Sequence, residues 1–268
     1  NSAYRFHTAT KSWSEYQFKD IINLDSLNQS QYFVKNFSKK WKNIVWNSIF
    51  NTDFIHAKGK DFYIGINPIV DLQVGRDGDK STWVNTRGAE IKGTIGDNFA
   101  FYSNLRENQA VFLDYVTRYI KEKYVVPGQG WGRPFKKNGF DYANASAYIA
   151  FRPVYWLQGV LGYGKNFIGD GYRSLILSDN AFSYPYLKLT ANVWNIQYSC
   201  YYSQMTDRSK TLSDKTYPRK YTIIHYIDWA VTKRLNLGLF DAIVCRAQDD
   251  NGIRRGFDLQ YINPIIFL

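Results

Sequence analysis

From residue 61 onward, apolar and polar side chains alternate with a period of two over stretches of strand length. Successive side chains of a β-strand point to opposite faces, so this pattern predicts strands rather than helices. The nine expected strands are Phe62–Val74, Trp83–Ile95, Phe99–Gln109, Phe140–Phe151, Trp156–Phe167, Tyr184–Val193, Gln197–Met205, Tyr221–Val231 and Leu235–Arg246.

The connections between these strands alternate strictly in length from the second strand to the ninth. Short connections are expected at 96–98, 152–155, 194–196 and 232–234, and long polar ones at 110–139, 168–183, 206–220 and from 247 onward. Outer-membrane barrels have short turns at one end and long loops at the other, whereas Greek-key sandwiches do not ordinarily sort their connections in this way. The predicted fold is therefore all-β, as a transmembrane antiparallel up-and-down β-barrel.

The two faces of individual strands support a barrel unevenly. In the strand that starts at Tyr184, Lys188 and Thr190 fall on one face and Leu187 and Leu189 on the other, as expected for a wet lumen and an apolar exterior. The eighth and ninth strands fit less well, because Asp228 and Asp241 interrupt apolar rows. A charge on the lipid face is costly, so each aspartate is expected to reach the lumen through a local bulge or to lie near an interface.

The first sixty residues differ from the rest, since they are polar, basic and rich in Asn and Ser. Apolar residues in 31–50 recur at three- and four-residue spacings, which predicts an amphipathic helix. Residues 1–60 are expected to form a small, partly helical N-terminal element, and 61–268 the first part of the barrel. The apolar ending YINPIIFL and the odd strand number lead us to expect more strands in a longer chain.

The amino-acid composition is consistent with a transmembrane β-barrel but does not distinguish it from other all-β folds. Aromatic residues make up 18% of the chain, with 22 Tyr and 8 Trp, and no apolar run reaches the roughly 18 residues of a transmembrane helix. Aromatic girdles and alternating strands give a barrel this composition. A soluble β-sandwich or propeller fits the composition almost as well.

The net charge of +11 raises the question of a nucleic-acid partner. The charges are scattered, and the densest cluster, KNFSKKWK at 35–42, mixes basic with aromatic residues as a solvated helix face does. We expect no nucleic-acid partner. Anionic lipid or an acidic glycan would suit the charge equally well.

Motifs that carry catalytic or metal chemistry are missing from the sequence. It contains neither HExxH nor GxSxG, and its two cysteines and three histidines show no ligand spacing. No enzyme activity, metal or cofactor is therefore expected.

Two glycine-rich stretches, 127–135 and 162–171, contain GxG, but their spacing matches no phosphate-binding loop, and turn chemistry explains them better. Asp170 and Asp179 are the one nearby carboxylate pair that glycoside hydrolysis could use, although Asp170 beside Tyr172 and Arg173 fits an ion pair that fixes the loop. The apolar centre of this loop, SLILS at 174–178, is expected to fold into or over the barrel mouth. In the preceding long loop, Phe112, Tyr115, Val116 and Tyr119 predict a short helix packed on the loop or the barrel mouth.

Aromatic and charged side chains on the two outer loops suit sugar binding, because rings stack on sugars and charged groups bind hydroxyls or carboxylates. Packing within the loops would explain these residues equally well. The candidate glycan-binding residues are Trp131, Arg133, Asp170, Tyr172 and Arg173.

Several segments resemble a known family. They are NTRGAEIKGTIGDNFAFYSNLRENQ from Asn85, VPGQGWGRPF from Val126, 140–189 and the closing YINPIIFL, and the most specific block is GKNFIGDGYRSLILSDN. These residues resemble the Wzi-like capsule-assembly outer-membrane proteins, and are most similar to the branch with the RemB-type gliding-motility proteins.

The resemblance implies a barrel of about eighteen strands, with a helical N-terminal element on its periplasmic side, in the outer membrane of a Gram-negative bacterium. It also implies a non-enzymatic protein that binds or organises surface or capsular polysaccharide. The implied partners are outer-membrane lipid and lipopolysaccharide, that polysaccharide, and other outer-membrane, gliding or secretion proteins. Two alternatives stay open: an adhesion or assembly component of the gliding or secretion machinery, and a soluble β-rich glycan hydrolase.

Overall fold

The structure is a computed structural model, and it describes residues 10–12, 53–169, 174–206, 217–232 and 234–248, together with 253 and 261. The helix expected at 31–50 lies outside these residues. The chain divides into two compact units, which we treat separately. Unit 2 consists of Ser14–Ala150 and Asn180–Ser183, and unit 1 of Asn1–Trp13, Phe151–Asp179 and Tyr184–Leu268.

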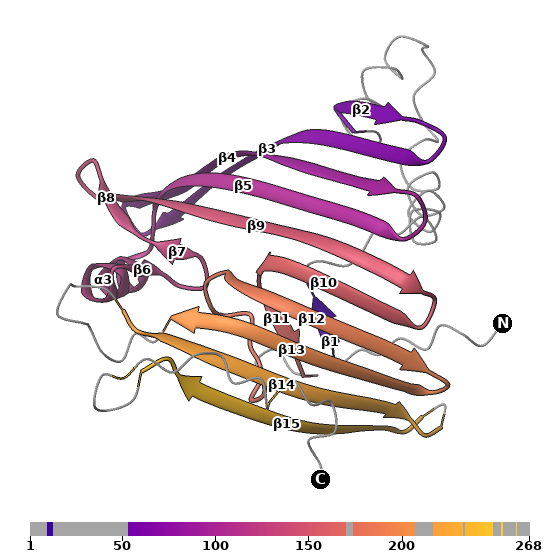
Figure 1. Cartoon of the computed structure of the whole chain (residues 1–268). Helices are drawn as coiled ribbons and strands as arrows, with labels where there is room; N and C mark the ends of the chain where they lie inside the picture. Colours follow the sequence, from indigo (N-terminus) through magenta and orange to yellow (C-terminus); the bar gives the residue numbers. More distant parts are fainter. Residues whose placement is uncertain are drawn as a thin grey trace. The chain divides into compact units, whose positions relative to one another are not determined.

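The fold class is all-β and antiparallel. Unit 2 contains hydrogen-bonded strands in the order β9-β5-β4-β3-β2, with the short β8 on β9 (Figure 1). Their bounds are β2 Ile55–Lys58, β3 Phe62–Asp77, β4 Lys80–Ile95, β5 Phe99–Val111, β8 Arg133–Phe135 and β9 Gly139–Val154, of which the residues from Phe151 onward belong to unit 1. Helix α3 (Asp114–Lys123) and the small hairpin of β6 (Val125–Val126) and β7 (Gly130–Trp131) lie between β5 and β9.

Unit 1 contains a second run of neighbouring strands, in the order β15-β14-β13-β12-β10. Their bounds are β10 Leu157–Gly164, β12 Tyr184–Val193, β13 Ile196–Thr206, β14 Arg219–Ala230 and β15 Asn236–Arg246. A separate pair of short strands, β1 (Thr10–Ser12) and β11 (Asn166–Ile168), belongs to the same unit.

All nine predicted strands are present in the structure, several of them longer than expected. The predicted strand 156–167 divides into β10 and β11, because the chain leaves β12 after Gly164 and pairs with β1 instead. The short connection expected at 152–155 was placed too early, since β9 continues through Val154 and the turn is Tyr155–Trp156. The short helix expected near Phe112 is confirmed as α3.

Tight turns join β3 to β4 and β4 to β5. Gly78 and Gly96 both have φ of 59°, a left-handed conformation that glycine adopts without a steric penalty. The amide of Gly96 also donates a hydrogen bond to the carbonyl of Asp61 at 2.6 Å, which ties two neighbouring turns together.

On several strands the apolar row is exposed and the polar row is buried, which is the reverse of the pattern in soluble proteins. On β12, the row of Tyr184, Tyr186, Lys188 and Thr190 is buried, whereas Leu187 and Leu189 are exposed. Leu161 on β10, the register partner of Leu187, is 63% exposed. In unit 2, Val70, Leu72 and Val74 on one face of β3 are 71 to 92% exposed. An exposed apolar row beside a covered polar row is unusual for a soluble protein.

Segments outside the long strands cover the polar face within each unit. In unit 2, Ile120 of α3 and Val126 of β6 pack with Ala110, Phe140 and Tyr142. In unit 1, Ile168 packs with Tyr201, Ile224 and Tyr226, and Ile176 and Leu177 join this cluster. In the loop centre at 174–178, Ile176 and Leu177 therefore pack against the sheet, whereas Leu175 is exposed, and the expected position over a barrel mouth stays a prediction.

The two aspartates that interrupt apolar rows were expected either to reach the lumen through a local bulge or to lie near an interface. The ladders of β13, β14 and β15 run without a bulge, with Gln197, Asp228 and Gly238 in register. Asp228 is 2% exposed and shares the covered face with Ile224 and Tyr226, so regular alternation alone places it there. Asp241 lies on the other face, directly opposite His225.

β14 departs from the simple two-face pattern, since Ile223 and His225 are buried although they share a face with the exposed leucines of β12. The backbone of Tyr261 lies within hydrogen-bonding reach of His225, which explains part of this burial. In the part of the chain that the structure describes, no helix combines the length and apolar character needed to cross a bilayer.

Candidate functional site

The long loop between β5 and β9 is folded and presents the predicted residue Trp131. Helix α3 ends at Tyr124, whose φ of 58° is left-handed and whose amide donates to the carbonyl of Ile120 at 2.7 Å. The chain then turns at Gly128, where φ is 67°, and returns so that Trp131 pairs with Val125. A hydrogen bond from the Gly132 amide to the Tyr124 carbonyl, at 3.1 Å, continues this small hairpin.

The start of α3 is also fixed to the sheet. Lys80, at the β3–β4 turn, donates a hydrogen bond to the carboxylate of Asp114 in the first turn of the helix. This bond and the positive charge of Lys80 lower the pKa of Asp114. An acidic residue in the first turn also suits the positive end of the helix dipole.

Trp131 is 44% exposed, and its ring packs against that of Phe182. The two rings pack edge to face, with their centroids 5.7 Å apart. Gly130 lies so close to β9 that a Cβ there would come within 2.8 Å of the Ala143 carbonyl oxygen. The hairpin therefore lies directly over β9, and Phe182 sets the direction of the indole.

Three amide side chains lie on the segments next to this aromatic pair: Gln129 two residues before Trp131, Asn180 two residues before Phe182, and Asn144 on β9. Asn144 of β9 donates to Oε1 of Gln129 at 2.9 Å. Oδ1 of Asn180 lies 3.0 Å from the position that a Cβ on Gly128 would take. We call Trp131, Phe182, Gln129, Asn144 and Asn180 the Trp131 cluster. Amide groups beside an accessible indole can bind sugar hydroxyls while the ring stacks on the sugar.

The other predicted glycan-binding residues are only partly placed. Arg133 is exposed on β8, where its register partner is the exposed Asp141 of β9. It lies two residues from Trp131 and so brings a positive charge to the same loop. Asp170, Tyr172 and Arg173 lie outside the described residues.

Asp179, which was considered as half of a carboxylate pair with Asp170, lies near Lys165, while Asp170 is outside the described residues. Burial lowers the pKa of Lys165, and the charge of Asp179 partly opposes that effect. This placement fits the expectation that the charges of this loop fix its fold.

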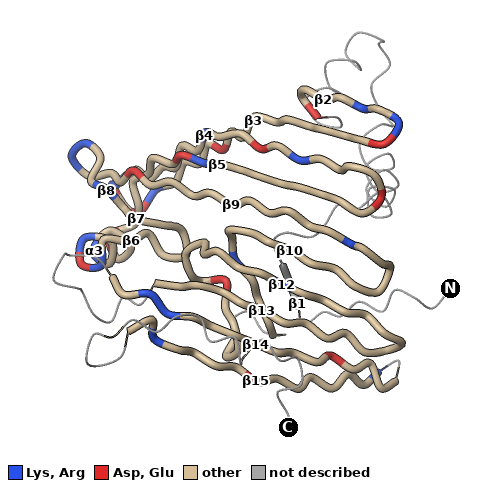
Figure 2. The backbone as a smooth tube through the Cα atoms, in the orientation of Figure 1, with Lys and Arg blue, Asp and Glu red and all other residues tan. Residues whose placement is uncertain are grey.

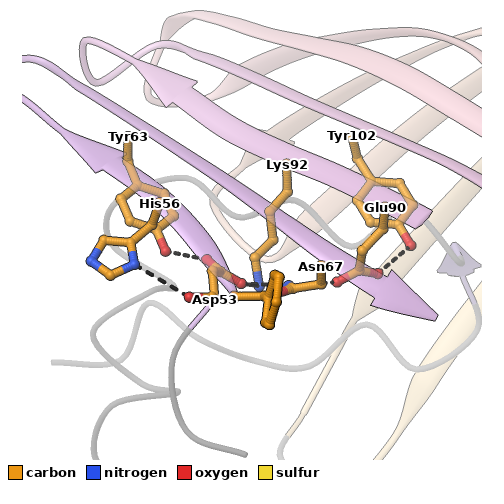
Figure 3. Close-up of polar contacts among 8 residues, drawn as sticks. Asp53, His56, Tyr63, Asn67, Glu90, Lys92 and Tyr102 are labelled. Carbon is orange, nitrogen blue, oxygen red and sulfur yellow. Dashed lines mark hydrogen bonds and ion pairs between the residues drawn. The ribbon is translucent and has the colours of Figure 1, made fainter. Parts of the chain in front are cut away.

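A second polar site extends over β3, β4 and β5 of unit 2 (Figure 3). Asp53, just before β2, places its carboxylate over the sheet and accepts hydrogen bonds from Tyr63 and from Asn67, the latter at 2.6 Å. Nζ of Lys92 approaches the same carboxylate at 2.9 Å. We call these four residues the Asp53 cluster.

The network continues across the sheet through residues in register. Asn67 also donates to Glu90 at 3.1 Å, and Tyr102 donates to the other oxygen of Glu90 at 3.1 Å. Asn104 donates to the Tyr102 hydroxyl at 2.9 Å and accepts from the backbone amide of Ser146 on β9 at 3.2 Å. A continuous line of hydrogen bonds therefore joins residue 53 to β9.

The Asp53 cluster suits a structural role better than acid–base catalysis. Burial raises the pKa of Asp53, but the hydrogen bonds from Tyr63, Asn67 and Lys92 and the charge of Lys92 outweigh it and lower the pKa overall. A carboxylate held ionised by three donors is a poor proton carrier near neutral pH. Its effect is to hold residue 53 against the polar face of unit 2.

Strand pairing also brings together two residues that the sequence leaves 25 positions apart. Cys200 and His225 are register neighbours on β13 and β14, with Sγ 3.3 Å from Nδ1. Tyr198 contacts the same nitrogen at 2.5 Å. Among the described residues, no group of three or more His, Cys, Asp or Glu side chains is arranged to hold a metal ion.

Sequence reasoning missed Gln129, Asn144, Asn180 and Phe182 as parts of the Trp131 cluster. They come from three separate segments, and no motif links them. The comparison with known protein families, curated proteins and solved structures gave no match to this chain.

Proposed function

We propose that this protein is an outer-membrane β-barrel that binds or organises cell-surface polysaccharide through the Trp131 cluster, without catalysis. The observation that carries the proposal is the inverted distribution of rows: apolar rows are exposed, and polar rows are covered by the protein's own loops. The Wzi-like resemblance of the sequence supports the same assignment.

Energetics favour lipid as the surrounding of the apolar rows. Burying an aliphatic side chain is worth about 1.5–3 kcal/mol, so rows such as Val70, Leu72 and Val74 forgo several kcal/mol in water. Hydrocarbon around them would recover that energy. Strands β12 to β15 contain 10 to 12 residues, close to the roughly 9–11 that a tilted strand needs to cross a bilayer.

The Trp131 cluster supplies the glycan contact in this proposal. The open part of the indole stacks on a sugar ring, and the neutral amides of Gln129, Asn144 and Asn180 accept or donate hydrogen bonds to hydroxyls. Arg133, two residues away, adds a charge-assisted bond to a carboxylate on the sugar. The Trp131 cluster and Arg133 therefore suit a polysaccharide in which an uncharged sugar is next to a sugar that carries a carboxylate.

The adhesion or assembly role is the second candidate, and one observation favours it. Three tyrosines at helix α3 are 44 to 69% exposed: Tyr115 and Tyr119 within it, and Tyr124 directly after it. Exposed tyrosines on a rigid helix are common anchors of protein–protein contacts. In that case the loop would bind a protein of the gliding or secretion machinery instead of a glycan.

Two measurements test the main proposal. On the full-length protein, boiled and unboiled samples run differently on a gel if a barrel is present, and equal mobility counts against it. For the glycan, binding to an immobilised neutral glucan and to alginate is compared. Trp131→Ala is expected to weaken both by roughly tenfold, about 1.4 kcal/mol, and Arg133→Ala only alginate. Tyr155→Ala, an equally large exposed aromatic in a short turn, is the control and should change neither.

A further inference from the structure

We propose that one edge of unit 1 inserts into the interface between lipid headgroups and hydrocarbon, with Trp194 as its anchor. The edge consists of the turn residues Tyr155, Trp156, Val193 and Trp194, together with Leu235 and Leu237, and we call it the turn rim. The proposal rests on the barrel assignment, and it adds which residues and which end of the strands meet the membrane interface.

Hydrogen bonds join these turns into one continuous edge. The amide of Asn192 donates to the carbonyl of Trp156 at 2.7 Å, which connects the β9–β10 turn to the end of β12. The amide of Ala230 donates to the carbonyl of Asn195 at 2.9 Å, which connects the next turn to the end of β14. Trp229 then pairs with Leu237 at the start of β15.

The turn rim is accessible and mainly apolar, with Arg234 as an exposed charge in the β14–β15 turn. Tyr155 is 89% exposed and Trp194 80% exposed, and Val193 and Leu235 are exposed as well. Residues 153–160 and 189–200 contain no Lys, Arg, Asp or Glu, and Figure 2 shows the turn between β12 and β13 uncoloured by charge. Helix α3, by contrast, carries charged residues in both its first and its last turn.

Trp194 occupies a position that its side chain does not suit. Its φ is 56°, in the left-handed region where Asn and Gly are favoured and where a bulky side chain is strained. Because the side chain is mostly exposed, packing against the protein does not compensate for that strain. An apolar surrounding at this edge would give the exposed indole a favourable place despite the strained backbone.

Lipid fits the turn rim better than a protein partner. The exposed row of Leu187, Leu189 and Val193 on β12 runs directly into the turn that carries Trp194. A protein bound at the turn would cover the tip but would leave that row in water. A bilayer covers both, since Trp and Tyr concentrate at the headgroup level while aliphatic rows face the chains.

The test uses the full-length protein in phosphatidylcholine vesicles with bromine either near the headgroup end or near the terminal end of the acyl chains. Bromine near the headgroups is expected to quench Trp194, so Trp194→Phe should lose part of the shallow quenching and keep the deep quenching. Trp131→Phe, in the outer loop, should leave both unchanged. Identical shallow quenching of Trp194→Phe and the original protein overturns the proposal.

A second variant separates anchoring from packing. Glycine suits φ of 56°, so Trp194→Gly should unfold in detergent at the same temperature or higher. In vesicles, the same variant should lose part of the extra stability that the bilayer gives to the original protein. An equal loss of stability in detergent and in vesicles would show that Trp194 stabilises the protein by packing, and would overturn the proposal.

The gel test separates this proposal from the barrel assignment on which it rests. If boiled and unboiled samples run with equal mobility, the barrel itself is refuted. If only the turn rim proposal is wrong, the mobility difference remains.

Discussion

The carboxylate of Asp53 fills the space above Gly65, where a Cβ would come within 2.1 Å of Oδ2. Three donors then hold the carboxylate in place, with Lys92 at 2.9 Å completing its partners. Glycine at position 65 is needed because any side chain there would displace Asp53 from the polar face of unit 2.

Gly65→Ala is therefore expected to destabilise the protein by about 1–3 kcal/mol, the usual cost of overpacking a close contact. The matched control is Gly159→Ala on β10, where the new Cβ would lie 3.5 Å from the Leu189 side chain, an ordinary contact. Urea unfolding in detergent measures both. Equal midpoints for the two variants would show that the Asp53 cluster does not constrain position 65.

The lowered pKa of Asp53 predicts that the free energy of unfolding depends on pH. Its pKa is lowered in the folded protein, so its contribution is present above the ordinary value of 3.8 and is lost as pH falls through the folded value. Asp53→Asn removes the charge but keeps the shape, and should cost about 1–3 kcal/mol at pH 7.

The measurement is urea unfolding of both proteins between pH 7 and pH 3. The gap between them should be constant from pH 7 to about 5 and should narrow steadily below about pH 4. A gap that stays the same down to pH 3 would mean that ionised Asp53 adds nothing through Lys92, Tyr63 and Asn67.

Phe182 predicts how firmly the indole of Trp131 is held. Removing one ring of an edge-to-face pair costs about 0.5–1.5 kcal/mol, so Phe182→Ala should weaken alginate binding by up to roughly tenfold. The loss should be smaller than that of Trp131→Ala, because the stacking surface remains. Phe112→Ala is the wrong comparison, since Phe112 packs against Phe140 and Tyr142 in the core of this unit. Phe182→Tyr, which keeps the ring, is the suitable control and should retain most of the affinity.

Local patterns predicted the strands well, and long-range contacts could not be predicted. The period of two around Tyr184–Val193 specifies β12 because alternation is a property of neighbouring residues. Three contacts depend on strand register and loop folding: Trp131 with Phe182, Asp53 with Gly65, and Cys200 with His225. No short stretch of sequence encodes these pairs. Asp228 shows the same limit, since its place on the covered face follows from register and needs no bulge.

Of the predicted glycan-binding residues, the structure describes only Trp131 and Arg133, which the sequence identified by residue type, and their glycan role stays a prediction. Their amide neighbours Gln129, Asn144 and Asn180 were missed because amides are common in loops and give no signal alone. Asn144 could have been included, since it alternates with Tyr142 and Ser146 on the polar face of its strand.

A substitution on an exposed apolar row tests the central claim most directly. Leu161 is 63% exposed near the middle of β10, where its register partner is Leu187 of β12. In a soluble protein, Leu161→Arg at such an exposed site should change stability by less than about 0.5 kcal/mol. In a barrel, the same arginine meets hydrocarbon and should cost about 2–4 kcal/mol, whereas Tyr155→Arg in the turn should cost about 0–1 kcal/mol. Urea unfolding of the full-length protein in phosphatidylcholine vesicles gives both values. A loss of about 2 kcal/mol or more for Leu161→Arg, with little change for Tyr155→Arg, is the predicted result, and no loss for Leu161→Arg would contradict the barrel.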